Sequence, residues 1–291
     1  MKTTTIGYKQ KPVHNLLFLL SFSVFAMTIS SCSQDDTSAI PEPPQGDLVF
    51  NSQQELDDFN WPEFSVVKGS LIIDDYETEA SSQVTDLSAL SHITTIEGDL
   101  EIRNTRKLMT LSGLEKIETV NGSIRIYENL KLQTTESLST LSSLGEGITI
   151  TDNRELLDIK GLQGLSGVAN DVFINDNPKL SSLEGLNQIR TIDGGLHLIN
   201  NHSLSTLNEL SALELVKGRL SIGGNTNLSN LDGLNKLIKL DGNLIINYND
   251  QLANFCGLSN LLQNGSYNGQ SIIHDNLKVV SDQDIAQGNC K

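Results

Sequence analysis

The sequence lacks the motifs by which most enzymes are recognised. No serine or cysteine lies in a known nucleophile motif, and no glycine-rich segment matches a phosphate-binding loop. His197 and His202 are five residues apart across a predicted turn, a spacing that is poor for sharing a metal ion. We therefore predict no catalytic residue, no cofactor and no enzymatic activity.

Positive charge is also scarce. The chain has 20 Lys and Arg against 36 Asp and Glu, and its net charge is −16 at pH 7. Because an acidic surface repels phosphate groups, nucleic acid is not expected as a partner.

A hydrophobic run long enough to span a membrane is missing as well. The longest apolar stretch, Leu16–Met27, is too short for a confident span and follows three lysines, so residues 1–31 are predicted to be a cleaved signal peptide. The segment Ile29-Ser30-Ser31-Cys32 resembles the lipobox of bacterial lipoproteins, in which the cysteine is acylated after cleavage. Cys32 is thus the predicted lipid attachment site, and an ordinary secretory signal with a chance cysteine is the alternative.

The residues after Cys32 predict where the protein is sorted. Ser33 stands where Asp would favour retention in the inner membrane, and the acidic run to Asp36 resembles a surface-export tag of Gram-negative lipoproteins. A merely polar start of a tether remains the alternative. Residues 32–47 are predicted to be the lipidated cysteine and a flexible tether. Removal of residues 1–31 leaves 17 basic and 36 acidic residues, a net charge of −19.

Cysteine is rare, with only 3 in the chain. Besides Cys32, Cys256 and Cys290 remain, both near the C-terminus. In an oxidising envelope these two are expected to form a disulfide, with two free thiols as the alternative.

What the chain does contain is a repeat of 24 residues. One column is aliphatic from Ile102 to Ile246, and a second consists of leucine from Leu108 to Leu252. A third column is asparagine: Asn129, Asn153, Asn177, Asn201, Asn225 and Asn249. A short, strict period indicates a solenoid, in which one unit stacks on copies of itself. We predict a β-solenoid, a right-handed parallel β-helix of leucine-rich-repeat type with 24-residue rungs.

Each rung combines two patterns. Alternation in Ile96-x-Gly98-x-Leu100-x-Ile102 predicts a half-buried strand, and the three-residue spacing of the leucines that follow is typical of 3₁₀ turns. The asparagines fall at the corner after the strand, where we predict a buried structural ladder that bonds the backbone. A ligand-binding role would require them to point outward.

Nine rungs are expected, with a cover at each end. Residues 48–65 form the predicted N-terminal cap, with a short helix that begins after Ser52. Residues 66–280 form the solenoid, and residues 281–291 form the C-terminal cap.

The complete rung, Ile-x-Gly-x-Leu-x-Ile-x-x-Asn-x-x-Leu-x-x-Leu-x-Gly-Leu-x-x-Leu-x-x-Ile, resembles the receptor L domain, a leucine-rich-repeat-like β-helix found in growth-factor receptor ectodomains and in bacterial lipoproteins. The resemblance spans about residues 66–280, and seven consecutive rungs follow it without insertion. The chain lacks the cysteine-rich modules, transmembrane helix and kinase of the receptors. What the resemblance implies is therefore a binding scaffold.

Outward positions of the strands are the candidates for binding. Apolar, aromatic and basic side chains interrupt a face that should otherwise be uniformly polar, which is typical of an interaction surface. The predicted ligand-binding face comprises Arg125, Tyr127, Phe173, His197, Ile199 and Ile245. Scattered apolar residues without a function are the alternative.

Three acids also share one rung position: Glu128, Asp152 and Asp176. Neighbours in this column are expected about 4.8 Å apart, so the column is a weak candidate for a Ca²⁺ site. Solvated turn residues are the favoured interpretation. Together with Arg125, the column leaves a remote alternative, a calcium-dependent polysaccharide-active enzyme.

These observations predict a lipid-anchored outer-membrane protein that faces the cell exterior and binds a protein or glycan. The alternative is a scaffold lipoprotein that faces the periplasm and has no soluble ligand.

Overall fold

The computed structural model describes residues 43–59, 61, 64–76 and 83–291. The predicted signal peptide, the predicted lipidation site Cys32 and most of the predicted tether lie outside the described residues.

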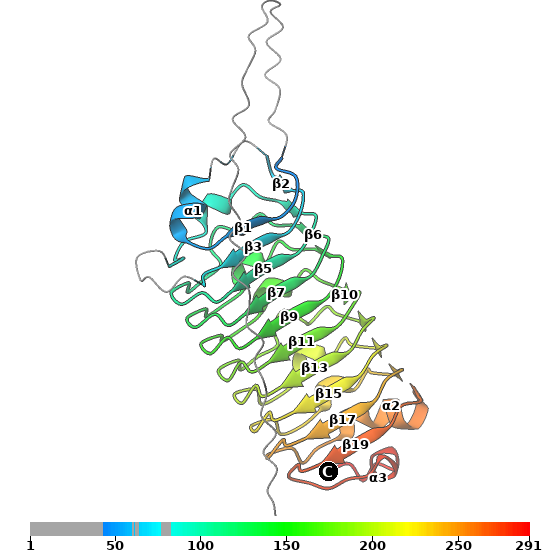
Figure 1. The fold of residues 1–291 in the computed structure, drawn as a ribbon. Helices are drawn as coiled ribbons and strands as arrows, with labels where there is room; N and C mark the ends of the chain where they lie inside the picture. Colours follow the sequence, from blue (N-terminus) through cyan, green and yellow to red (C-terminus); the bar gives the residue numbers. More distant parts are fainter. Residues whose placement is uncertain (1–42, 60, 62–63, 77–82) are drawn as a thin grey trace, which may run out of the picture. The chain divides into compact units, whose positions relative to one another are not determined.

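Ten parallel strands form one continuous sheet, which runs the length of the repeat region (Figure 1). The strands follow one another in chain order, and each aliphatic column of the sequence becomes one row of paired residues, as in Ile102, Ile126 and Ile150. The strands are β1 (Leu48–Phe50), β3 (Leu71–Asp74), β5 (Leu100–Arg103), β7 (Ile124–Tyr127), β9 (Ile148–Thr151), β11 (Val172–Asn175), β13 (Leu196–Ile199), β15 (Leu220–Gly223), β17 (Leu244–Asn247) and β19 (Ser271–His274).

A second side of each coil carries a two-residue strand. These strands form two separate parallel sheets. The first contains β2 (Val66–Val67), β4 (Thr95–Ile96), β6 (Thr119–Val120) and β8 (Ser143–Leu144). The second contains β10 (Gly167–Val168), β12 (Thr191–Ile192), β14 (Leu215–Val216), β16 (Lys239–Leu240) and β18 (Ser266–Tyr267).

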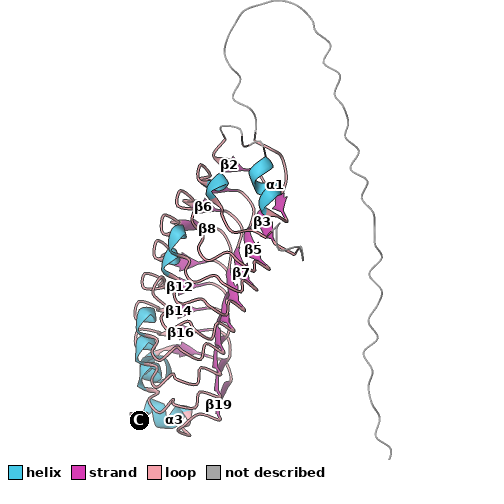
Figure 2. Ribbon diagram, turned by 90° about the vertical axis from the view of Figure 1, so that its left-hand side faces the viewer, coloured by secondary structure: helices cyan, strands magenta, loops and turns pink. Residues whose placement is uncertain are grey.

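Short 3₁₀ segments lie on the side of the stack away from the ten-stranded sheet (Figure 2). They occur where leucines recur every three residues, which matches the three residues per turn of a 3₁₀-helix. The segments are η1 (Ser88–Leu90), η2 (Glu136–Leu138), η3 (Lys160–Leu162), η4 (Asn208–Leu210), η5 (Asp232–Leu234) and η6 (Cys256–Leu258).

The interior is aliphatic, and the asparagine column runs through it as a ladder. The six predicted asparagines are fully buried. Each side-chain oxygen accepts the backbone N–H of the ladder residue one coil earlier, as Asn177 Oδ1 does from Asn153 at 3.1 Å. Each side-chain nitrogen donates to a strand carbonyl of the preceding coil, as Asn177 Nδ2 does to Ile150 at 2.9 Å. The amides thus satisfy backbone groups at a corner where strand pairing has ended.

Two further residues complete this ladder, Thr105 at the first position of the period and Asn276 beyond its last asparagine. Thr105 begins it and donates its hydroxyl to Asn129 Oδ1 at 2.7 Å. Asn276 ends it and accepts the backbone N–H of Asn249 at 3.2 Å. Asn276 was not apparent in the sequence because three extra residues in the last full rung displace it from the period.

The N-terminal cap contributes more than the sequence predicts. Helix α1 (Gln53–Asp58) begins after Ser52, whose side chain accepts the Glu55 backbone N–H. The stretch predicted to be only a cap also supplies β1, which pairs with β3 and is an additional strand ahead of the nine predicted rungs. Phe50 of β1 packs against Phe59 and Trp61, with ring centroids 5.3 and 5.5 Å away.

The C-terminal end is closed by α2 (Ser259–Asn264), α3 (Asp282–Ala286) and a disulfide. Cys256 and Cys290 are bonded, with a Cα–Cα distance of 5.0 Å and a separation of 34 positions in the sequence. The predicted disulfide is therefore present. The prediction of a parallel β-solenoid is confirmed, and no helix among the described residues is long and apolar enough to cross a membrane.

Candidate functional site

The candidate site is the outer face of the ten-stranded sheet, meaning the side chains of its strands that point away from the core. Along the strands from β3 to β17 the inward residues are fully buried, and the outward ones are mostly half-buried. This alternation follows from the two-residue period of a strand. All six residues predicted to bind ligand lie on this outer face.

The part of the outer face on β3, β5 and β7 is a closed network of charged groups. Arg103 forms ion pairs with Asp74, at 2.7 Å, and with Glu101. It also donates to the Tyr127 hydroxyl at 2.7 Å, and that hydroxyl in turn donates to Glu101 at 2.6 Å. On the neighbouring position Arg125 pairs with Asp99.

The contacts of this network favour the protonated forms of its arginines and of its tyrosine. The hydrogen bond to Asp74 raises the pKa of Arg103, and the hydrogen bond to Asp99 raises that of Arg125. Burial and the hydrogen bond to Glu101 raise the pKa of the Tyr127 phenol. Arg125 and Tyr127 thus make contacts between neighbouring strands.

The part of the outer face on β11 and β13 is aromatic and apolar. Phe173 and His197 are directly paired in the sheet, and their rings stack with centroids 4.5 Å apart and planes inclined by 16°. Burial lowers the pKa of His197 against the opposing effect of Asp171, so the imidazole is neutral at neutral pH. Phe173 covers one face of the imidazole, and Ser221 is the residue paired with His197 on the other side.

A slot opens where β15 lacks large outward side chains. Its floor consists of Ser221, Gly223 and Gly224, and Ser221 is only 6% exposed although it points outward. One wall is formed by His197, Ile199 and Asn200. The other wall is formed by Ile245, Asn247 and Tyr248, and the hollow measures about 370 Å³.

The two glycines make room for the side-chain amides of the slot walls. A Cβ on Gly223 would lie 2.7 Å from Asn247 Oδ1, and one on Gly224 would lie 2.1 Å from Asn200 Oδ1. Gly224 also has a left-handed φ of +65°. The amide oxygens of both walls therefore occupy space that a side chain on the floor would take.

Tyr248 stands at the corner of the slot in an unusual conformation. Its φ is 55°, in the left-handed region where large side chains are rare. The ring is 57% exposed and contacts His274 edge to face at a centroid distance of 5.6 Å. Left-handed backbone is required at this corner in every regular coil, and most coils place Asn, Asp or Gly there.

The same corner requirement accounts for the column of acids. Glu128, Asp152 and Asp176 have φ between 55° and 57°, and short polar side chains tolerate that conformation better than most. Asp176 accepts a hydrogen bond from Asn200 at 2.8 Å. Among the described residues no group of three or more His, Cys, Asp or Glu is arranged to hold a metal ion. The arrangement therefore gives no support to the predicted Ca²⁺ candidate, and Arg125 is held by Asp99 instead of acting with this column.

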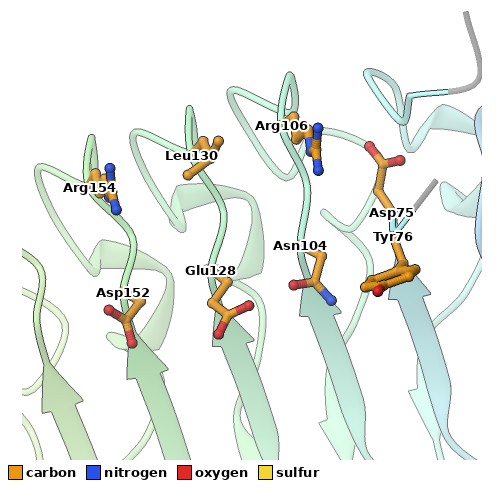
Figure 3. A pocket seen from close by; sticks show the side chains of 8 residues that line it. All are labelled: Asp75, Tyr76, Asn104, Arg106, Glu128, Leu130, Asp152 and Arg154. Atoms are coloured by element: carbon orange, nitrogen blue, oxygen red, sulfur yellow. The ribbon is translucent and has the colours of Figure 1, made fainter. Parts of the chain in front are cut away.

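A second hollow, of about 380 Å³, lies at this corner in the first coils (Figure 3). Glu128 and Asp152 line one edge at the strand ends, and Arg106 and Arg154 line the opposite edge. Asp75 is buried beside them, and burial raises its pKa. Three carboxyl groups and two guanidinium groups thus line one space, and this mixed charge selects no single class of ligand.

The structure separates the six predicted ligand-binding residues into two groups. His197, Ile199 and Ile245 line the slot, and Phe173 supports His197 from behind. Arg125 and Tyr127 belong to the charged network. The sequence analysis missed the slot itself with Arg219, Asn247 and Tyr248. The available signal was Gly223-Gly224, which follows an inward aliphatic where other rungs have larger outward residues.

A model of the family described as Receptor L domain matches residues 65–189 of the chain. The resemblance found in the sequence is confirmed for these residues. No curated protein matches the chain. The slot lies beyond the matched residues, but β13, β15 and β17 continue the register of the preceding strands without a break.

Proposed function

We propose, on the premise that residues 65–189 are a receptor L domain, that the solenoid is a ligand-binding module that recognises a protein or a glycan through the slot half of its outer face. The matched family is one of ligand-binding domains and not of enzymes. One observation carries the choice of surface. The slot half combines apolar walls, a neutral histidine and polar groups around a hollow, whereas most charged groups of the other half pair with one another. Concave, mostly apolar surfaces with a few polar groups are typical of binding sites.

The proposal also includes a cellular location. The lipobox-like segment that ends at Cys32 and the acidic residues after it support a lipid-anchored protein of the outer membrane that is exposed to the exterior. Several acyl chains hold a protein durably on a membrane, since each buried CH₂ contributes about 0.8 kcal/mol. A scaffold lipoprotein that faces the periplasm is the alternative.

Protease treatment of intact cells tests this location. Digestion of the solenoid and antibody labelling without permeabilisation are expected for the native chain. The variant Cys32→Ala should be released from the membrane fraction. Protection from protease until the outer membrane is broken would reject surface exposure and favour the periplasmic alternative.

A capture experiment tests the binding surface. Residues 33–291, immobilised through the N-terminus, are screened against glycan and protein arrays. The double variant Ile199→Glu, Ile245→Glu places two negative charges on the slot walls, and Thr149→Glu, Thr151→Glu places the same charges on β9. Ligands should bind the native chain and the β9 variant and be lost from the slot variant. Equal binding to all three would show that the slot half is not the site.

A further inference from the structure

The width of the slot limits what can enter it. His197 and Ile245 lie on β13 and β17, which are two strand spacings apart, or about 9.6 Å. The two side chains project into this spacing from either side, so about one ring at van der Waals contact fits between them. Spacing does not separate a planar ring from a puckered, saturated one, and the polar groups along the slot decide between them.

The walls offer apolar faces and polar edges. The open face of the His197 ring and the Ile245 side chain lie on opposite sides of Ser221. Among the described residues none forms a hydrogen bond with the side-chain amide of Asn247, and the only bond that Asn200 makes through its side chain uses the nitrogen. Two amide oxygens and one amide nitrogen are therefore available along the slot. A sugar ring has the matching character, with C–H groups on its faces and hydroxyl groups around its edge.

Charge in the slot differs from that of the rest of the molecule. The chain has 36 Asp and Glu, yet none of the described residues that line the slot is acidic. The slot also contains Arg219, which forms no ion pair with another described residue and lies immediately before β15, two residues ahead of Ser221. A guanidinium group binds a carboxylate through two parallel hydrogen bonds.

We propose that the slot binds one sugar residue that bears a carboxylate, a uronic acid unit of a glycan. The ring lies between His197 and Ile245, its hydroxyl groups contact the amides of Asn200 and Asn247, and its carboxylate contacts Arg219. This inference rests on the proposed function and specifies its ligand. A peptide carboxylate and a sulfated sugar are the competing occupants that the experiment must separate.

The experiment measures the binding of defined oligosaccharides to residues 33–291 by calorimetry. The probes are galacturonic-acid and glucuronic-acid oligomers, the neutral galactose and glucose oligomers of the same length, and a sulfated oligomer. Uronic acid oligomers are expected to bind, and neutral oligomers to bind at least 10-fold more weakly. The variant Arg219→Gln should weaken uronic acid binding by roughly 10- to 100-fold, because a hydrogen-bonded charge is lost. The matched variant Arg154→Gln removes an arginine from the corner hollow and should leave binding unchanged.

A second pair of variants tests the slot by shape. Gly223→Ile fills the floor of the slot. The only atom closer than 3.0 Å to the new Cβ is Asn247 Oδ1, at the end of a side chain that can rotate away. A β-branched residue suits a strand better than glycine, so the melting temperature should not fall. Binding should be abolished, whereas Thr151→Ile at the same position of β9 should bind like the native chain.

The outcomes separate this inference from the proposed function. Equal binding of neutral and uronic oligomers, or full binding by Arg219→Gln, would overturn the carboxylate assignment. Preference for the sulfated oligomer would overturn it as well. Capture of proteins alone, abolished by Gly223→Ile, would overturn the sugar and leave the proposed function standing. Ligands that bind equally to the native chain and to Gly223→Ile would overturn the slot as their site.

Discussion

Replacement of one ladder asparagine should destabilise the whole domain. Asn177 is fully buried, and its side chain forms four hydrogen bonds of 3.2 Å or less, with Asn153 (backbone and side chain), Ile150 and Asn175. Counting about 1 kcal/mol for each bond, Asn177→Ala should lower the free energy of unfolding by about 4 kcal/mol. A value of this size is at the upper end for single substitutions, because the Asn153 N–H is left without an acceptor in the interior.

Urea unfolding of residues 33–291, followed by far-ultraviolet circular dichroism, measures this loss. The control is Asn121→Ala, since Asn121 is exposed and its side chain forms no hydrogen bond with another described residue. The control should change stability by less than about 0.5 kcal/mol. A loss below about 1 kcal/mol for Asn177→Ala would contradict the reasoning, since it would mean that the buried backbone groups find other partners.

Three further perturbations follow from the structure. Replacement of Cys256 and Cys290 by serine should cost roughly 4 kcal/mol on the chain-entropy model, and reductant should then no longer change the melting temperature as it does for the native chain. Burial lowers the pKa of His197 from its ordinary value of 6.5, so the unfolded chain binds the proton first. This contribution to stability is present above pH 6.5 and is lost as the pH falls, so acidification from pH 7 to 5 should lower the melting temperature less in His197→Gln than in the native chain. Tyr248→Asn removes the cost of a left-handed backbone at tyrosine, about 1 kcal/mol, and loses one ring contact with His274 of about 0.5–1.5 kcal/mol. Because the two effects oppose each other, calorimetry should find a free energy of unfolding within about 1 kcal/mol of the native value. A larger loss would show that the ring is part of the core.

Much of the fold could be predicted because the residues that point into the core recur every 24 positions. The spacing from Ile102 to Ile126 fixes which residues pair in the sheet, and the asparagines mark the corner that follows. β1 was missed because it precedes the first complete rung and has no partner before it. Its inward residues, Leu48 and Phe50, resemble a cap in sequence because no earlier coil sets a period for them.

The candidate site was less predictable because outward residues obey no period. Tyr127 and His197 are similar candidates in the sequence, and both are large, polar-tipped and outward. Only the structure shows that Tyr127 bonds Glu101 and Arg103, whereas His197 borders a hollow. The slot forms where Gly223 and Gly224 have no side chains, and a search of the sequence for large or charged outward residues does not detect such positions.

The row of two-residue strands is interrupted between β8 and β10, although the ten-stranded sheet is continuous. Coils on either side of this interruption are joined through β9, β11 and the asparagine ladder, but the described residues show no pairing between Ser143–Leu144 and Gly167–Val168. In a linear array each coil is coupled only to its neighbours, so one weaker junction sets where cooperativity ends. Under load or partial denaturation, the array is expected to separate into two blocks at this junction, and the slot belongs wholly to the C-terminal block.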